Sequence, residues 1–389
     1  MQYLGTDYYN ITSLLSEEEL AIQKTARDFV QAEFIPHIQD HFRKATFPLD
    51  IIPQLGKLGF LGANFPEDVG GAGVNNVAYG LIMQELERGD SGLRSFASVQ
   101  GGLVMYPIWR YGSEDQKNKW LPKLASGELI GCFGLTEPEF GSNPGGMVTR
   151  ARQDGSDWII NGSKMWITNG TIADIAVIWA KDEDDNIQGF LVEKGTIGFE
   201  APEMHGKMSL RASITSELVL SDVRISDSNR LPEAMGLSAP LSCLSQARYS
   251  IAWGVLGPAI ECYEVALEYS KNRRQFSRPI AGYQLTQEKL VDMLQEITKS
   301  QLLILQLGRL KDIDQANFNR ISLAKRNNVS MARDCAKSAR EILGANGITD
   351  DYPVIRHLLN LESVYTYEGT HEMHTLIVGE DITGFRAID

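Results

Sequence analysis

Tyr367-Glu-Gly-Thr-His371, near the carboxyl end of this 389-residue chain, places a glutamate in an otherwise apolar segment. Burial disfavours the charged form of a carboxyl group, so partial desolvation of Glu368 would raise its pKa toward the range of a general base. The ordinary alternative is a solvated glutamate that ends a helix beside a glycine. The stretch therefore presents Glu368 as a candidate base for proton abstraction.

Two other stretches could bind a polar cofactor. Residues 132–143 end a predicted strand in a loop with Gly134, Gly141 and several hydroxyl and carboxyl side chains, which offers backbone and hydroxyl donors. In Trp166-Ile-Thr-Asn169 an aromatic side chain and a hydroxyl follow a predicted hairpin. A Thr-Glu-Pro turn can instead cap a helix, and a hairpin tryptophan can pack in a core. Periodicity alone favours these structural explanations, because short motif matches are only hypotheses.

Other motifs lack the residues that their chemistry needs. Gly71-Ala-Gly73 follows no predicted strand and has Asn76 at the third glycine position of a dinucleotide fingerprint. Gly206-Lys207 lacks the earlier glycine and the following hydroxyl of a phosphate-binding loop. The histidines of His371-Glu-Met-His374 are three residues apart instead of four, so we expect no zinc site and no other metal. The chain also has no Gly-x-Ser-x-Gly nucleophile elbow.

The elements that would position these stretches fall into three parts. Residues 1–130 are predicted to be helical, with a capping box at Ser16-Glu-Glu-Glu19 ahead of apolar residues at helical spacing. Residues 131–232 contain short β-branched segments with hairpin turns at Asp154-Gly155 and Asn161-Gly162, which predict an antiparallel barrel or sandwich. Residues 233–389 return to long amphipathic helices with short joins, which predict a four-helix bundle. The predicted fold class is thus α+β.

Composition argues against several classes of protein. Hydrophobic residues make up 43% of the chain, enough for large buried cores, and the formal net charge of -13 argues against a nucleic-acid-binding protein. No apolar run reaches the length of a membrane span, so we expect no membrane insertion. The amino terminus has neither a signal nor a transit pattern, and four scattered cysteines indicate free thiols. We expect a cytoplasmic protein, or a mitochondrial matrix protein if a transit peptide has been removed.

Two signatures resemble those of the acyl-CoA dehydrogenase family of flavoproteins. Gly134-Leu-Thr-Glu-Pro-Glu-Phe-Gly-Ser-Asn143 resembles the first, and Glu341-Ile-Leu-Gly-Ala-Asn-Gly-Ile348, continued by Asp351, Arg356 and Asn360, resembles the second. Arg273-Arg-Gln-Phe276 with Gln284 resembles the stretch that reaches the FAD pyrophosphate across a subunit interface in that family. The similarity covers nearly the whole chain, and it implies the family's fold: an N-terminal helical domain, a middle β domain and a C-terminal four-helix bundle. It also implies an enzyme that contains FAD and oxidises acyl-CoA thioesters.

The resemblance implies roles for individual residues. Glu368 would be the catalytic base, and its backbone amide, with a flavin ribitol hydroxyl, would hold the thioester oxygen. The residues implied to bind substrate are Glu87, Arg94, Ser95, Ser98, Ser142, Arg248, Tyr367 and Gly369. The residues implied to bind the cofactor are Phe133, Leu135, Thr136, Ser142, Trp166, Thr168, Arg273, Phe276, Gln284, Glu341, Gly344 and Thr370.

Within the family, the chain resembles the glutaryl-CoA dehydrogenases in four segments: residues 87–100, 206–212, 247–257 and 360–371. A guanidinium at Arg94 suits an ω-carboxylate, which it can bind through two parallel hydrogen bonds, better than a neutral acyl chain. The alternative is that Arg94 is an exposed helix residue. The resemblance implies oxidation of glutaryl-CoA followed by decarboxylation to crotonyl-CoA and CO2, with Glu87 tuning Arg94 and Tyr367 favouring the release of CO2.

The resemblance further implies an electron-transfer flavoprotein as electron acceptor and a homotetramer. Several alternatives stay open: another short-chain acyl thioester on CoA or on a carrier protein, glutaryl-CoA oxidation without decarboxylation, an oxidase that uses oxygen, and an inactive flavin-binding homologue. The chain departs from the usual pattern, near the expected flavin and CoA edges, at Phe140, Asn143, Ala345 and Ser245-Gln246.

Overall fold

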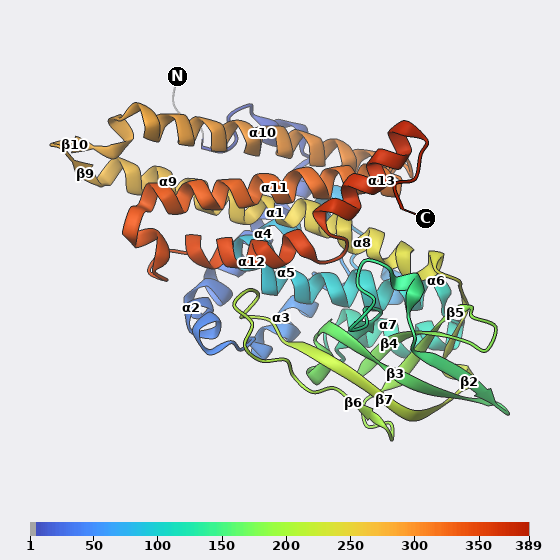
Figure 1. Cartoon of the computed structure of the whole chain (residues 1–389). Helices are drawn as coiled ribbons and strands as arrows, with labels where there is room; N and C mark the ends of the chain where they lie inside the picture. The colour runs from blue at the N-terminus through green and yellow to red at the C-terminus, as the bar shows by residue number, and fades with distance from the viewer. Residues whose placement is uncertain (1–4, 389) are drawn as a thin grey trace.

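The computed structural model describes residues 5–388. Residues 1–4 and 389 lie outside the described residues, and so does the start of the amino-terminal pattern that bears on targeting. Helices, a β-sheet and again helices follow one another along the chain, and Figure 1 shows the sheet packed beneath the helical layers. The predicted α+β class and the order of its parts are confirmed. Among the described helices, none is long and apolar enough to cross a membrane.

The first part of the chain builds a helical layer around two buried helices. Its α-helices are α1 (Glu17–Phe29), α2 (Ile35–Lys44), α3 (Ile52–Lys57), α4 (Asn76–Gly89), α5 (Ser91–Ser98), α6 (Tyr106–Tyr111) and α7 (Glu114–Ala125), with a π-helical segment η5 (Val99–Met105) after α5. The predicted capping box starts α1, with the Glu19 N–H donating to Ser16 and the Ser16 N–H donating to Glu19. Helices α4 and α5 are buried along nearly their whole length, and Asp90 caps α5 by accepting the Gly92 N–H at 2.8 Å.

An eight-stranded sheet forms the middle part, in the order β6-β7-β3-β2-β4-β5-β8 with β1 beside β4. The strands are β1 (Gly131–Gly134), β2 (Arg150–Asp154), β3 (Asp157–Thr168), β4 (Ile175–Lys181), β5 (Ile187–Glu193), β6 (Phe199–Glu200), β7 (Thr215–Ser226) and β8 (Arg230–Met235). The sheet differs from an antiparallel barrel, because β1 and β2 each pair with β4 in parallel and the pairing order is open between β6 and β8. The long connection through β2 and β3 lets β4 run in the direction of β1.

One of the two predicted hairpin turns is wrong. Asp154-Gly155 does join β2 to β3, but β3 continues through Asn161-Gly162, where the register with β7 shifts by a bulge. The Asn161 side chain donates to Asp222 of β7 at 2.9 Å and accepts the Asp222 N–H at 2.8 Å. Because the neighbouring strand satisfies these polar groups, the Asn-Gly pair continues β3 opposite a bulge in β7 instead of reversing the chain.

The carboxy-terminal part is the predicted helical bundle. Its helices are α8 (Ser238–Gly254), α9 (Leu256–Asn272), α10 (Gln284–Asp312), α11 (Phe318–Leu343), α12 (Val354–Thr366) and α13 (His371–Thr383). Helix α11 contacts α8, α9, α10, α12 and α13, so it is the centre of the bundle. The short hairpin of β9 (Arg274–Gln275) and β10 (Arg278–Pro279) lies at the end of the bundle opposite α13 (Figure 1). Cys132, Cys243, Cys262 and Cys335 are free and buried, as predicted.

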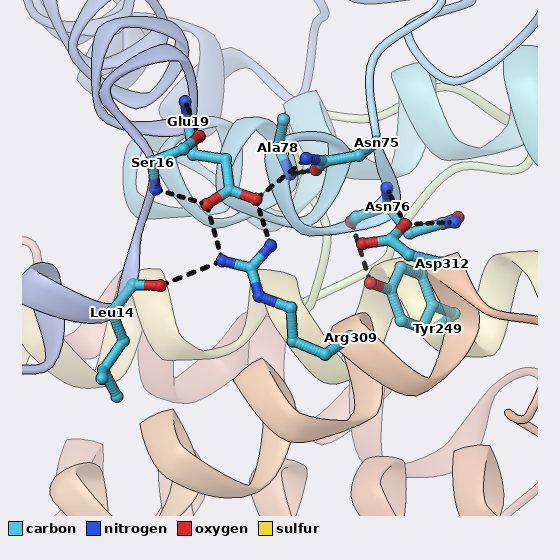
Figure 2. A network of polar contacts seen from close by, with 9 residues as sticks. All are labelled: Leu14, Ser16, Glu19, Asn75, Asn76, Ala78, Tyr249, Arg309 and Asp312. Carbon is cyan, nitrogen blue, oxygen red and sulfur yellow. Dashed lines mark hydrogen bonds and ion pairs between the residues drawn. The ribbon is translucent and has the colours of Figure 1, made fainter.

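A polar network joins the amino-terminal helices to the bundle. The buried carboxylate of Glu19 accepts from Arg309 of α10 at 2.8 Å and from Asn75 at 2.9 Å (Figure 2). Arg309 also donates to the carbonyl of Leu14 at 3.0 Å. Hydrogen bonds from Arg309, Ser16 and Asn75 outweigh the effect of burial and lower the pKa of Glu19. The charged form of Glu19 therefore holds α1, α4 and α10 together.

We expect Glu19→Gln to lower the stability of the protein by about 1–2 kcal/mol at pH 7, since the Arg309 head is partly exposed and water screens the pair. Because the pKa of Glu19 is lower in the folded state, this contribution is present above the unfolded pKa and is lost as the pH falls through the folded pKa. Urea unfolding midpoints at pH 7 and near pH 4 test this, with Glu18→Gln, an exposed neighbour, as control. An equal loss at both pH values would contradict the assignment.

Candidate functional site

Residues 367–370 form a tight loop between α12 and α13 and carry Glu368. Glu368 and Gly369 both have left-handed backbone conformations, with φ of 53° and 91°. A Cβ on Gly369 would lie 3.0 Å from Nε2 of His374, which favours glycine there. Thr370 caps α13 by accepting the Met373 N–H at 3.2 Å. The Glu368 residue is half-buried, but its Oε2 is shielded from solvent and has no hydrogen-bond partner within residues 5–388, so Glu368 is not a solvated helix end.

Arg94 forms a buried ion pair close to this loop. Its Nε donates to Oε2 of Glu87 at 2.7 Å, its Nη2 donates to the hydroxyl of Tyr367, and both charged side chains are 0% exposed. The third nitrogen, Nη1, has no hydrogen-bond partner in the described part of the chain. A Cβ on Gly254 would lie 2.1 Å from Oε2 of Glu87, so the missing side chain makes room for the pair. Arg94 is therefore a buried cation with unused donor capacity.

Burial sets the protonation of this cluster. It raises the pKa of Glu368, against the opposing charges of Arg94, Lys325 and Arg248. Burial also raises the pKa of Glu87, which Arg94 opposes, and raises that of Tyr367 to about 12, so Tyr367 is a neutral phenol at pH 7. A carboxyl group with a raised pKa beside a cation can accept a proton from a weak carbon acid and return it.

The structure brings most of the predicted substrate residues into one region. Arg248 of α8 donates through Nε to the carbonyl oxygen of Glu368 at 2.8 Å. Ser95 and Ser98 are buried on the same helix as Arg94, and Ser98 shares a hydrogen bond of 2.6 Å with Ser250. Ser142 is exposed on the loop after β1.

A second group of predicted residues lies at the end of β3. Two register shifts interrupt the pairing of β3 with β7, and at the second Trp166 adopts a φ of 64° and is 60% exposed. A bulge of this kind redirects a side chain, so Trp166 is not a core residue. The Met165 N–H donates to the carbonyl of Thr136 at 2.9 Å, which holds the half-buried Thr136 beside the bulge and near the half-buried Thr168. Phe133 and Leu135 are buried, so their side chains pack in the core instead of lining this surface.

The Thr-Glu-Pro turn is organised by a buried ion pair and caps no helix. Lys164 donates to Oε1 of Glu137 at 2.7 Å, and both side chains are at most 2% exposed. The same carboxylate accepts the N–H groups of Val148 and Thr149 at 2.7 and 3.0 Å. Hydrogen bonds and the Lys164 charge lower the pKa of Glu137 despite the cost of its burial. Glu137 therefore closes the loop that carries Ser142.

Five predicted cofactor residues lie away from Glu368 in the same chain. Arg273, Phe276 and Gln284 belong to the hairpin region at the opposite end of the bundle from α13, and Phe276 is 91% exposed (Figure 1). Glu341, at the end of α11, forms an ion pair with Lys289, and Gly344 follows it. One chain therefore does not bring these residues together with Glu368.

Several residues support the site in ways that local patterns did not predict. Asp90 accepts from Arg356 at 2.6 Å and from Asn360 at 2.8 Å, which fixes α12 against the start of α5. Asn360 also accepts the N–H of Leu210 at 2.8 Å, so the segment 206–212 joins the sheet to the bundle. Lys325 is 1% exposed on α11. The sequence feature that could have indicated its burial is its helical spacing: Lys325 falls on the same buried stripe of α11 as Ile321, Asn328 and Ala332.

The three parts of the chain match the domains of a known protein family. Profiles of the N-terminal, middle and C-terminal domains of acyl-CoA dehydrogenase match residues 16–128, 132–223 and 234–383. The chain belongs to the acyl-CoA dehydrogenase family. It is 33% identical to the human mitochondrial short-chain specific acyl-CoA dehydrogenase over 380 residues, which cover 96% of this chain and 92% of the relative.

Two solved structures resemble this acyl-CoA dehydrogenase over nearly its whole length. A glutaryl-CoA dehydrogenase from Mycobacterium smegmatis, in complex with FADH2, is 52% identical, with a TM-score of 0.98 and full coverage of both chains. A glutaryl-CoA dehydrogenase in complex with glutaryl-CoA is 32% identical, with a TM-score of 0.92 and 96% of each chain covered.

FAD is the cofactor of this acyl-CoA dehydrogenase, and the residues at the end of β3 fit it. Trp166 exposes its ring at the end of β3, and Thr168 of the same strand and Thr136, whose carbonyl accepts the Met165 N–H, add hydroxyl groups that suit a planar, polar ring system. Asn169, the next residue, has a buried Nδ2 with no hydrogen-bond partner in the described part of the chain, which leaves a donor for a ligand. No cluster of three or more His, Cys, Asp or Glu side chains within residues 5–388 could hold a metal ion.

Proposed function

We propose that this protein oxidises glutaryl-CoA and decarboxylates the product to crotonyl-CoA and CO2. The observation that carries the proposal is Nη1 of Arg94, a buried guanidinium nitrogen without a partner in the described chain, beside the loop of Glu368. Glu87 already pairs with Nε of Arg94, so what Nη1 lacks is a hydrogen-bond acceptor, which an ω-carboxylate supplies and an unsubstituted acyl chain does not. The 52% identity to the Mycobacterium smegmatis glutaryl-CoA dehydrogenase supports the same substrate.

In this proposal Glu368 removes the α-proton of the thioester. Its raised pKa suits transfer of a proton from carbon, and the left-handed turn aims the carboxylate into the protein. The backbone N–H of Glu368 donates to the thioester oxygen and stabilises the enolate. When bound, FAD supplies the acceptor for the hydride that leaves the β-carbon. Trp166 and Thr168 orient the ring of the cofactor.

Arg94 and Tyr367 hold the ω-carboxylate through this step and then release it. The bond between the carboxyl carbon and the chain breaks, its electron pair enters a dienolate, and CO2 leaves. Protonated Glu368 returns its proton to the dienolate, which gives crotonyl-CoA and restores the carboxylate. Glu87 keeps Arg94 charged and fixed in place.

A second candidate is the oxidation of a short saturated acyl-CoA, which the 33% identity to the human short-chain enzyme supports. A short saturated acyl chain carries no ω-carboxylate, so this substrate would leave Nη1 of Arg94 without a hydrogen-bond partner. Oxidation of glutaryl-CoA without decarboxylation, a thioester on a carrier protein, an oxidase, and an inactive flavin-binding homologue are further outcomes that product analysis distinguishes.

The proposal includes a second subunit and an external electron acceptor. Because Arg273, Phe276 and Gln284 lie at the opposite end of the bundle from Glu368, they would complete the FAD site of a neighbouring copy, as in a homotetramer. An electron-transfer flavoprotein would reoxidise the cofactor.

Anaerobic incubation of the purified FAD-loaded protein with glutaryl-CoA and an artificial one-electron acceptor tests the proposal. We expect the flavin to bleach before the acceptor is added, and mass spectrometry then to find crotonyl-CoA and CO2 in equal amounts. Glutaconyl-CoA alone would rule out decarboxylation. Bleaching with butyryl-CoA but not with glutaryl-CoA would favour the second candidate, and oxygen consumption without an acceptor would identify an oxidase.

A further inference from the structure

Two buried cations bind the backbone of the loop that carries Glu368. Lys325, from the middle of α11, donates through Nζ to the carbonyl oxygen of Tyr367 at 2.5 Å and to that of Gly369 at 2.7 Å. Arg248, from α8, donates to the intervening carbonyl of Glu368 at 2.8 Å. Three consecutive carbonyl groups therefore point at cations that come from two different helices.

The conformation of this loop explains why it needs such support. Glu368 has a φ of 53°, in a region of backbone conformation that residues other than glycine rarely adopt. Gly369 follows with a φ of 91°. A strained backbone of this kind persists only where the surroundings over-determine it. The carbonyls of Tyr367 and Gly369 lie outside the hydrogen-bond ladders of α12 and α13, so Lys325 satisfies buried acceptors that the helices leave over.

We propose that Lys325 is a positioning residue for the base: its ammonium group binds the carbonyls on either side of Glu368 and holds the carboxylate in its reactive direction. This inference rests on the proposed function, in which Glu368 removes the α-proton. Lys325 itself touches backbone atoms of the loop, and its effect on the reaction passes through Glu368.

The charge of Lys325 also acts on the protonation of Glu368. Burial raises the pKa of Glu368, and Arg94 and Lys325 oppose that effect. Burial lowers the pKa of Lys325 to about 7, while the Glu368 carboxylate opposes this change. The other charged or titratable groups that face the pair are Arg94 from α5, Glu87 and Tyr79 from α4, Arg248 from α8, Tyr367 from the loop, and His371 and His374 from α13.

Removal of the ammonium group therefore has two expected consequences. The carboxylate loses its fixed direction, which slows proton abstraction, because small displacements of a catalytic group cost large factors in rate. Glu368 also loses a neighbouring cation, so its pKa moves up and the acidic limb of the rate profile moves to higher pH. A lysine that only filled space in the bundle would leave that profile unchanged.

The test uses the FAD-loaded holoenzyme and its anaerobic flavin bleaching with glutaryl-CoA and with butyryl-CoA, followed by stopped flow from pH 6 to 9. We expect Lys325→Met to lower the limiting bleaching rate by about 10- to 100-fold with either substrate that the wild type uses, with little change in the substrate concentration for half-saturation. Its acidic limb should move to higher pH. Lys325→Arg, which keeps charge and donors, should restore the wild-type limb.

Two controls make the result specific. Lys311→Met removes a half-buried lysine of the neighbouring helix α10 that donates to Gln246 at 3.0 Å, and should leave rate and pH profile unchanged. Lys325→Gln keeps an N–H donor but removes the charge. It replaces Lys325→Met in the experiment if the Lys325→Met protein does not fold or does not bind FAD. A wild-type rate and pH profile in Lys325→Gln, or an equal shift in Lys311→Met, would overturn the inference.

Glu368→Gln, measured alongside, separates this inference from the proposed function. If Glu368→Gln bleaches at the wild-type rate, Glu368 is not the base and the proposed function fails together with the role of Lys325. If Glu368→Gln is inactive and the Lys325 variants behave as wild type, only the positioning role is overturned.

Discussion

Replacement of Glu368 by glutamine is expected to lower the rate of flavin reduction by about 10²–10⁴-fold, the usual contribution of a positioned general base. Glutamine has nearly the same shape but cannot accept the α-proton as a carboxylate does. In the wild type, the rate should fall as the pH drops through the raised pKa of Glu368, because protonation removes the base. Anaerobic stopped flow at the flavin absorbance, with saturating glutaryl-CoA, measures both effects.

Glu372→Gln is the matched control for this experiment. Glu372 is an exposed glutamate in the first turn of α13, four residues beyond the base, and lies outside the proposed machinery. It should bleach at the wild-type rate, and both variants should retain FAD. A Glu368→Gln protein that keeps FAD and still bleaches within a few-fold of the wild-type rate would remove Glu368 from the mechanism.

The second large effect is expected when the buried pair of Arg94 and Glu87 is neutralised. Arg94→Gln alone leaves the Glu87 carboxylate buried without its partner, which is strongly destabilising, so Glu87→Gln with Arg94→Gln is the better variant. Loss of a buried charged contact to the substrate costs about 2–4 kcal/mol. We therefore expect kcat/KM for glutaryl-CoA to fall by about 30- to 1,000-fold, with a much smaller change for butyryl-CoA.

Arg88→Gln provides the control for selectivity. Arg88 neighbours Glu87 on α4 and forms ion pairs with Glu261 and Glu264, away from the loop of Glu368. Its ratio of kcat/KM values for the two substrates should equal that of the wild type. If the double variant also kept the wild-type ratio, Arg94 would not bind the ω-carboxylate and another substrate would have to be sought.

Much of the fold could be predicted because its signals are local. Ser16 and Glu19 cap α1 within one turn, and alternating segments around Asp154-Gly155 specify a hairpin through backbone geometry alone. Asn161-Gly162 carries the same local signal but continues β3 opposite a bulge in β7, because Asp222, far along the chain, satisfies the Asn161 side chain. The parallel pairing of β1 with β4 likewise depends on contacts across a long connection.

The amino-acid sequence by itself determined the order of helical and β parts, the family, its cofactor and the candidate base, since these are carried by contiguous signatures such as Tyr367–His371. Only the tertiary structure decided that Arg94 is a buried cation with an unpaired nitrogen, and that Lys325 binds the backbone beside Glu368. The physical reason is that burial and partners belong to the packing of α4, α5, α8 and α11 against one loop. A charged side chain in a helical stripe has the same local pattern whether it meets water or a carbonyl group.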